Sequence, residues 1–278
     1  QYIRNTPAGT LEFGARKYIE YFLRHGTTTI EANTGHALNA SGETKMLRVL
    51  AALDGQCASI VPTFFGAHVV PPEYAERGRD YITWLCAELI PRLRERGAAQ
   101  FAGVLCDPEG FGLEETSVYI DSARKANLPL KVHAERTARI GGAALAAKSE
   151  AVSIDGLNFA SDEDVDVIAR SRAVATLLPA RVLYGLDKRF PPARKLIQAG
   201  AAVALATGFQ PSVSSTFNMQ MIVSLACARM QMTAEEAISA ATINGAHALG
   251  RARRCGSLQF SKDADIIVLN ASDYREIP

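Results

Sequence analysis

The residues that could carry chemistry gather at the ends of short apolar runs. The clearest example is the stretch 130–136, Leu-Lys-Val-His-Ala-Glu-Arg, in which His133 closes an apolar run and Glu135 and Arg136 follow it. An imidazole near its ordinary pKa of about 6.5 exchanges protons at neutral pH or binds a metal ion. A histidine at the end of a buried strand therefore predicts a reactive pocket, and the alternative interpretation is a hydrogen-bonded core histidine.

Two further polar groups stand in the same kind of place. His68 and Asp107 each come shortly after an apolar run. We predict that His133, His68 and Asp107 are the catalytic residues, because imidazoles and carboxylates are the usual proton carriers in enzymes. Pro108, which follows Asp107, leaves open that this aspartate serves a turn instead.

The apolar runs alternate with helical patterns. Strands are expected over residues 27–31, 58–65, 101–106, 130–136, 151–155, 173–178 and 201–207. Helices are expected over residues 10–25, 46–53, 80–96 (kinked or divided at Pro91 and ended by Gly97), 114–126, 142–150, 192–199 and 216–230, with two more capped by Ser161 and Thr233. Strands that are apolar on both faces belong to parallel sheets, and seven strand–helix units in succession predict an α/β fold of the (β/α)8 TIM-barrel type. Such barrels place their chemistry at the C-terminal ends of the strands.

Two features lie outside a regular barrel. A barrel closes with eight strands, so we expect the first strand upstream of Gln1. The apolar run 264–269 predicts a last strand that is not part of the barrel's alternation of strands and helices. The expected organisation is a barrel domain over residues 1–255, holding strands two to eight, and a C-terminal segment over residues 256–278.

Composition narrows the classes of partner. The 278 residues include 30 basic and 29 acidic side chains, and the formal net charge of +1 gives no electrostatic footprint for nucleic acid or an anionic membrane. We expect a small-molecule substrate, no nucleic-acid or membrane partner, and allow for a homodimer. Five cysteines without CxxC spacing predict reduced thiols in a cytoplasmic protein, and residues 1–10 are too polar for a signal peptide.

Several stretches resemble the amidohydrolase superfamily and, within it, the imidazolonepropionase family. They are 26–31 (Gly-Thr-Thr-Thr-x-Glu), 63–74 (Thr-Phe-x-Gly-Ala-His-x-x-Pro-Pro-Glu-Tyr), 141–146 (Gly-Gly-Ala-x-Leu-Ala), 177–179 (Leu-Leu-Pro), 192–197 (Pro-Ala-Arg-x-Leu-Ile) and 240–246 (Ala-Ala-Thr-Ile-Asn-Gly-Ala). The resemblance covers essentially the whole chain in order. It implies a barrel of the amidohydrolase type and assigns residues 256–278 to a small β-sandwich, most of which this chain lacks.

The resemblance also implies a metal site, from which this sequence departs. Family members bind one zinc or iron ion through an HxH motif on the first strand, a histidine that ends strand five and an aspartate after strand eight. His133 matches the strand-five ligand, but no HxH occurs in the chain and Gly208 stands at the aspartate position. Arg136 replaces the catalytic glutamate and Gly156 the catalytic histidine. His133 is therefore predicted to bind metal only if an HxH lies upstream, and we expect no cofactor, with one zinc or iron ion as the alternative.

The same alignment predicts the residues that contact substrate. His36 takes the place of a family tyrosine, and Arg136 could bind a carboxylate or phosphate with two parallel hydrogen bonds. Glu31 keeps a family acid, while Gly156 and Gly208 could widen the pocket for a larger ligand. The alternative to a substrate contact is an ordinary salt bridge for Arg136 and for Glu31. For His36 the alternative is a solvent-exposed position in a loop.

Three functional hypotheses remain open at this point. The first is an enzyme that acts on a small cyclic or amide-like, anionic compound by non-hydrolytic acid/base chemistry (cyclisation, dehydration or isomerisation), without the complete family metal site. The second is a diverged metal-dependent hydrolase of cyclic C–N bonds. The third is an inactive protein that binds a ligand or partner.

Overall fold

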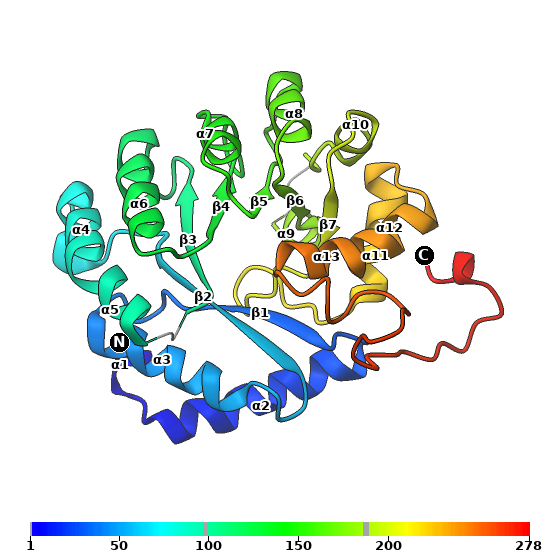
Figure 1. Cartoon of the computed structure of the whole chain (residues 1–278), viewed down its shortest axis with the longest axis horizontal. Coiled ribbons are helices and arrows are strands. Elements are labelled where there is room, and N and C mark those ends of the chain that lie inside the picture. Colours follow the sequence, from blue (N-terminus) through cyan, green and yellow to red (C-terminus); the bar gives the residue numbers. More distant parts are fainter. Residues whose placement is uncertain (1, 97–98, 186–188) are drawn as a thin grey trace.

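The computed structural model describes residues 2–96, 99–185 and 189–278, and one curled parallel sheet organises them (Figure 1). The described residues form seven strands that pair in chain order: β1 (Thr29–Asn33), β2 (Ser59–Ala67), β3 (Phe101–Cys106), β4 (Leu130–Ala134), β5 (Ser153–Gly156), β6 (Val174–Leu177) and β7 (Val203–Leu205). Every neighbouring pair is parallel. The predicted α/β architecture of the barrel type is confirmed.

Burial of both strand faces explains the parallel arrangement. All six residues of β3 are buried, and Val132 and Ile154 on the next two strands are fully inaccessible. Helices line the outer side of the curled sheet (Figure 1) and contribute Tyr119 and Ile168 to the same core cluster. Since each buried side chain of this size stabilises the fold by about 1.5–3 kcal/mol, the sheet and its helices hold one another in place.

Most predicted helices are present. They are α2 (Ala8–Arg24), α3 (Ala40–Leu53), α6 (Leu113–Lys125), α7 (Gly142–Lys148), α8 (Asp162–Ala169), α10 (Ala193–Gln198), α11 (Met219–Met230) and α12 (Ala234–Ala241). The helix α3 starts six residues earlier than predicted because the side chain of Asn39 caps it, accepting a hydrogen bond from the Gly42 amide. The predicted caps at Ser161 and Thr233 are confirmed, and each of them forms a capping box.

The helix predicted over residues 80–96 is divided, as expected from its proline. It consists of α4 (Gly78–Trp84), a π-helical turn η2 (Leu85–Leu89) and α5 (Ile90–Arg96). The wider turn ends at Leu89, two residues before Pro91, which cannot donate a backbone hydrogen bond. Gly97, predicted to end this helix, lies outside the described residues.

Several short helical segments were not anticipated. They are α1 (Tyr2–Asn5), α9 (Pro179–Tyr184) and the 3-10 turns η1 (Pro72–Tyr74) and η3 (Tyr274–Glu276). Another short helix, α13 (Ile243–Ala248), follows α12. In α9 the proline occupies the first helical turn, where its missing N–H costs nothing. The segment matters for function because α9 carries Arg181 to the end of the sheet.

The strand predicted over residues 264–269 is wrong for the described structure. These residues have no regular secondary structure and pair with none of the described strands, and Val268 is 91% exposed. A strand needs a neighbour for its backbone hydrogen bonds, and this segment has none among the described strands. The assignment of residues 256–278 to a β-sandwich stays a prediction. No described helix combines the length and apolar character needed to cross a membrane.

Candidate active site

The C-terminal ends of β4 and β5 bring two proton-carrying groups together. The strand register pairs His133 with Asp155, and Nε2 of His133 lies 3.2 Å from Oδ2 of Asp155. His133 retains 18% side-chain exposure, whereas the Asp155 side chain is 5% exposed. Asp155 was not among the predicted site residues, although the register of parallel strands could have indicated it.

The environment of this pair favours its neutral form. Burial lowers the pKa of His133 to about 3, helped by the charge of Arg181 and opposed by that of Glu31. Burial raises the pKa of Asp155, opposed by the charge of Lys131. The hydroxyl groups of Ser153 and Thr176 beside the carboxyl group also act against this rise. The site thus holds a neutral imidazole beside a buried carboxyl group.

A row of rings joins three predicted residues. The ring centroids of His36 and His68 are 6.1 Å apart, His68 stacks on Phe65 at 5.3 Å, and Phe65 contacts His133 at 4.7 Å. Nδ1 of His68 lies 2.8 Å from the carbonyl oxygen of Phe65. Burial lowers the pKa of His68, partly offset by this backbone contact. The structure therefore brings His36, His68 and His133 to one side of the strand ends.

An ion pair between buried Lys131 and partly exposed Glu31 lies one layer below His133. Nζ of Lys131 is 3.1 Å from Oε2 of Glu31 and donates to the Ser153 hydroxyl at 3.1 Å, and the Lys131 side chain is 2% exposed. Thr63 donates to the other oxygen of Glu31 at 2.6 Å, and Nζ of Lys131 lies 5.0 Å from the centre of the Phe101 ring. Glu31 thus links β1 to β4, which matches the salt-bridge interpretation that the sequence left open.

Asp107 holds the loop after β4. Its carboxylate accepts hydrogen bonds from the backbone amides of Arg136 (3.0 Å), Thr137 (2.9 Å) and Glu109 (3.3 Å) and from the Thr137 hydroxyl. The side chain is fully buried. Asp107 lies at the mouth with both oxygens engaged, so a loop-holding role accounts for its contacts and its predicted catalytic role stays a prediction.

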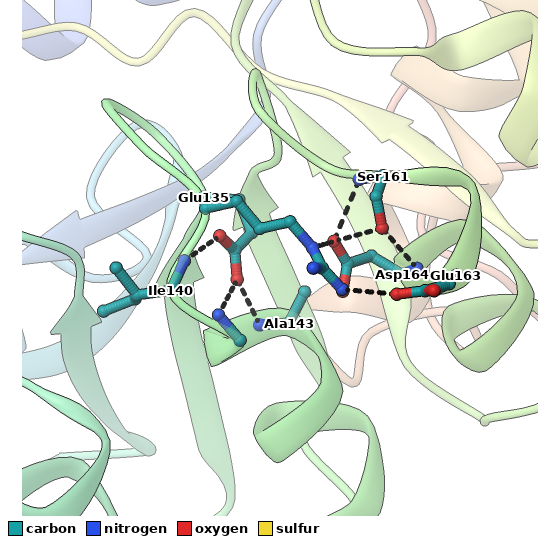
Figure 2. Close-up of polar contacts among 8 residues, drawn as sticks. Glu135, Ile140, Ala143, Ser161, Glu163 and Asp164 are labelled. Atoms are coloured by element: carbon teal, nitrogen blue, oxygen red, sulfur yellow. Dashed lines mark hydrogen bonds and ion pairs between the residues drawn. The ribbon is translucent and has the colours of Figure 1, made fainter.

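Glu135 fixes the same loop from its other side (Figure 2). Its buried carboxylate accepts the backbone amides of Ile140, Gly141 and Ala143 at 2.8–3.1 Å. Its backbone φ of +52° turns the chain away from the strand direction. The two carboxylates of Asp107 and Glu135 together give the loop a defined path over the strand ends.

The loop is also tied to the next helix. Nε of Arg139 donates to Asp164 at 2.7 Å and its Nη2 to Glu163 at 3.0 Å, while Asp164 caps α8 through Ser161 (Figure 2). This ion pair raises the pKa of Arg139 and, although burial opposes it, lowers that of Asp164.

Two arginines lie beside the glycines that the alignment singled out. A Cβ on Gly156 would lie 3.8 Å from Cβ of Arg136, and a Cβ on Gly208 would lie 3.1 Å from Cδ of Arg181. Arg136 forms an ion pair with Glu109, and Nη1 of Arg181 donates to the Gln210 amide oxygen at 3.4 Å. The Arg181 stem takes up part of the space at Gly208 that was predicted for a larger ligand. Arg181 itself was missed because its helix was not anticipated.

The described residues do not by themselves fit the family's metal ion. Within residues 2–96, 99–185 and 189–278 no group of three or more histidine, cysteine or carboxylate side chains could hold a metal. Gly208 offers no side-chain donor, and the charges of Arg136 and Arg181 disfavour a cation near His133. The prediction that His133 binds metal together with an upstream HxH remains untested.

Comparison with known proteins agrees with this architecture. The family model described as the amidohydrolase family matches residues 2–277. An imidazolonepropionase of Parabacteroides distasonis is 38% identical over 276 residues, which cover 99% of this chain and 66% of the relative. The imidazolonepropionase of Geobacillus kaustophilus is 39% identical over 95% of this chain and 62% of its own length. The chain thus spans a little under two thirds of the length of these curated relatives.

Solved structures share the fold at low sequence identity. A 5-methylcytosine deaminase from Klebsiella pneumoniae with bound 5-fluorocytosine superposes with a TM-score of 0.80 at 15% identity, covering 99% of this chain and 72% of that one. An adenosine deaminase from Xanthomonas campestris with bound zinc has a TM-score of 0.71 at 17% identity, covering 95% and 62%. The family match and the curated relatives, together with this fold, place the chain in the amidohydrolase family as an imidazolonepropionase-like member.

Proposed function

We propose that this protein is an imidazolonepropionase-like enzyme that acts on a small cyclic or amide-like, anionic compound by acid/base chemistry. The observation that carries the proposal is the 3.2 Å contact between Nε2 of His133 and Oδ2 of Asp155 at the ends of adjacent strands. His68 lies in the same ring cluster and is the second proton carrier of the proposal. The cyclisations, dehydrations and isomerisations that fit such a pair need proton transfer without added water.

The pair can act as a base oriented by a carboxyl group. Neutral His133 accepts a proton from the substrate, and the carboxyl group of Asp155, 3.2 Å away, orients the imidazole. Arg181 and Arg136 lower the pKa of His133, so an anionic substrate that offsets their charge raises the basicity of the imidazole. Substrate binding would in this way raise the proton affinity of His133, the base of the proposed reaction.

The test compares site variants with cyclic amides that carry a carboxylate, with turnover followed by NMR. We expect His133→Ala and Asp155→Asn each to lower kcat/KM by about 10²- to 10⁴-fold, the usual contribution of a positioned acid or base. His25→Ala, which changes a histidine at the end of α2, is the matched control and should leave turnover unchanged. Intact turnover in both His133→Ala and His68→Ala would sink the proposal.

Metal-dependent hydrolysis of a cyclic C–N bond is the second candidate, favoured by the likeness to longer imidazolonepropionases. In that case His133 would be one ligand and an additional segment would supply others. Metal analysis of the full-length protein by mass spectrometry separates the candidates. About one zinc or iron ion per chain, with activity lost on chelation, would establish the second and defeat the metal-free reaction. Absence of turnover with every ligand that raises the Tm would favour the inactive binding protein.

A further inference from the structure

The segment before α2 is tied to α3 by a single lysine. Nζ of Lys45, on α3, donates to three backbone carbonyl oxygens, those of Ile3 (2.7 Å), Arg4 (3.0 Å) and Thr6 (2.8 Å). An ammonium group has three N–H donors, so these three acceptors satisfy it completely. The segment 2–7, which includes α1, is therefore held beside α3 at the β1 end of the sheet (Figure 1).

Arg4 extends from this segment to two loops at the C-terminal ends of the strands. Its Nε donates to the backbone carbonyl oxygen of Ala37 at 2.6 Å, in the loop between β1 and α3. Its Nη1 forms an ion pair with Glu73, in the 3-10 turn η1 that follows β2. The guanidinium thus joins the loop that carries His36 to the loop that carries His68.

The loop that carries His36 is also held from its inner side. The buried carboxylate of Glu43 accepts hydrogen bonds from the backbone amides of Gly35 (2.7 Å), Ala37 (2.9 Å) and Leu38 (2.8 Å). Leu38 has a left-handed backbone conformation (φ +55°), which costs energy in a residue with a side chain and needs such contacts to persist. Since Ala37 also offers its carbonyl oxygen to the guanidinium, both of its peptide groups are engaged.

The loop that carries His68 contains a rigid stretch. The rings of Pro71 and Pro72 fix φ at two consecutive positions, and the Tyr74 amide donates to the Pro71 carbonyl oxygen at 2.8 Å. A contact made at Glu73 is therefore passed along the chain toward His68 rather than absorbed by bending of the loop.

The two loops meet where a glycine faces an imidazole. A Cβ on Gly35 would overlap the carbonyl oxygen of Phe65 and lie 2.9 Å from Cε1 of His68, so no side chain fits between the loops. The ring centroids of His36 and His68 are 6.1 Å apart and the ring planes are inclined at 74°. A small displacement of either loop therefore changes how the two imidazoles face each other.

We propose that Arg4 is a positioning residue of the site, which sets the distance and angle between His36 and His68 by joining their loops. The inference rests on the proposed function for the role of these imidazoles, since His68 is its second proton carrier. A planar guanidinium suits this task because its donors point in fixed and different directions. Arg4 acts outside the pocket and touches neither imidazole in this argument.

NMR of the histidine rings tests the inference without any turnover. In the full chain with 13C-labelled histidine, the ring protons of His36 and His68 are assigned with His36→Gln and His68→Gln. The wild-type protein should show a nuclear Overhauser effect between the two rings, and Arg4→Gln should weaken or abolish it. An effect that is absent from the wild type, or unchanged in Arg4→Gln, would overturn the inference.

Two variants of Glu73 give a second, independent test. Glu73→Gln keeps an acceptor oxygen for the guanidinium and should retain most of the effect between the rings. Glu73→Ala removes the acceptor and should weaken the effect as Arg4→Gln does. Combining Glu73→Ala with Arg4→Gln should add little to either, because both remove the same contact. An unchanged effect in Glu73→Ala, or additive losses, would contradict the link through Glu73.

Arg194 offers a matched control beside β7, the last strand of the series. Its Nε also donates to a backbone carbonyl oxygen, that of Gln231 at 3.0 Å, and its Nη2 also forms an ion pair, with Glu236. The exposed fractions of the two arginine side chains are similar, 27% for Arg194 and 25% for Arg4. Arg194→Gln should leave the effect between the imidazoles unchanged, whatever it does to the Tm. Equal losses in Arg194→Gln and Arg4→Gln would show that the effect follows overall stability and not the contacts of Arg4.

Turnover separates this inference from the proposed reaction. Arg4→Gln should lower kcat/KM by about 10- to 100-fold, as expected when a reacting group is misplaced by about 1 Å. If Asp155→Asn keeps full turnover while Arg4→Gln still weakens the effect between the rings, the acid/base proposal fails and the positioning role stands. If Asp155→Asn abolishes turnover while Arg4→Gln changes neither the effect nor turnover, the positioning role fails and the reaction stands.

Discussion

At the scale of single residues, the site is defined by groups that burial keeps uncharged. His133 and Asp155 face each other at the strand ends with shifted pKa values of opposite sign, down for the imidazole and up for the carboxyl. Such opposite shifts mark the pair as a candidate for proton transfer, because perturbed pKa values gather at functional sites. It also makes the stability of the fold depend on pH.

The pH dependence follows from the lowered pKa of His133. The unfolded histidine binds a proton near pH 6.5, while the folded one does so only near pH 3, so acid favours the unfolded chain. The stabilising contribution is complete above pH 6.5 and is lost as the pH falls toward 3. Between pH 7 and 4.5 we expect the Tm to fall more in the wild-type protein than in His133→Phe, which keeps a ring against Phe65. Parallel Tm curves would refute this assignment.

At the scale of elements, the loop after β4 depends on two carboxylates. Glu135 binds three backbone amides at the start of α7 (Figure 2). Asp107 binds three more groups of the preceding turn as well as the Glu109 amide. Hydrogen bonds to a buried charge are among the stronger ones in proteins. The position of Arg136 at the mouth therefore depends on these loop contacts.

Loss of the Glu135 contacts should lower the stability of the protein strongly, and the structural effect should be confined to the loop after β4. Glu135→Ala leaves three amides unpaired and should lower the free energy of unfolding by about 3 kcal/mol, measured by urea denaturation. Hydrogen exchange should accelerate at Ile140, Gly141 and Ala143 but not in β3. Glu150→Ala is a matched control, since Glu150 also has a positive φ (55°) but follows the end of α7 and lies on the surface. Equal destabilisation by both substitutions would show that the hydrogen bonds of Glu135 to the loop amides do not stabilise the fold.

Sequence patterns predicted the elements that local chemistry determines. The strand over residues 101–106 agrees at both ends, and the Ser161 capping box is present as expected. The start of α3 was missed because the cap at Asn39 decides it. The strand predicted over residues 264–269 does not form, because none of the described strands pairs with this segment. Asp155 and Arg181 were missed for the same kind of reason, since only the assembled sheet brings them to His133.

At the scale of the whole molecule, an aromatic cluster joins the first long helix to the loop after β7. Phe209 and Phe217 stack at 4.3 Å between ring centroids, and both contact Tyr18 and Phe22 of α2. These contacts connect segments almost 200 residues apart in the chain. The cluster therefore links the two ends of the strand series.

Removal of one ring tests this link. Phe217→Ala should lower the free energy of unfolding by about 2 kcal/mol, less than a fully buried phenylalanine because the ring is partly accessible. Phe13→Ala in α2, where the side chain is 79% exposed, should leave the free energy of unfolding within about 0.5 kcal/mol of wild type. Equal losses in the two variants would show that the cluster does not stabilise the fold.

The ion pair of Lys131 and Glu31 limits how this protein can evolve. The two residues lie 100 positions apart in the chain, and Nζ and Oε2 meet inside the sheet at 3.1 Å. Replacement of Glu31 alone leaves the buried Lys131 ammonium without its carboxylate partner, at a cost of about 3–5 kcal/mol, whereas a well-packed apolar replacement of both residues is often neutral. The two positions are therefore expected to change together during descent, and lineages that differ at one should differ at the other.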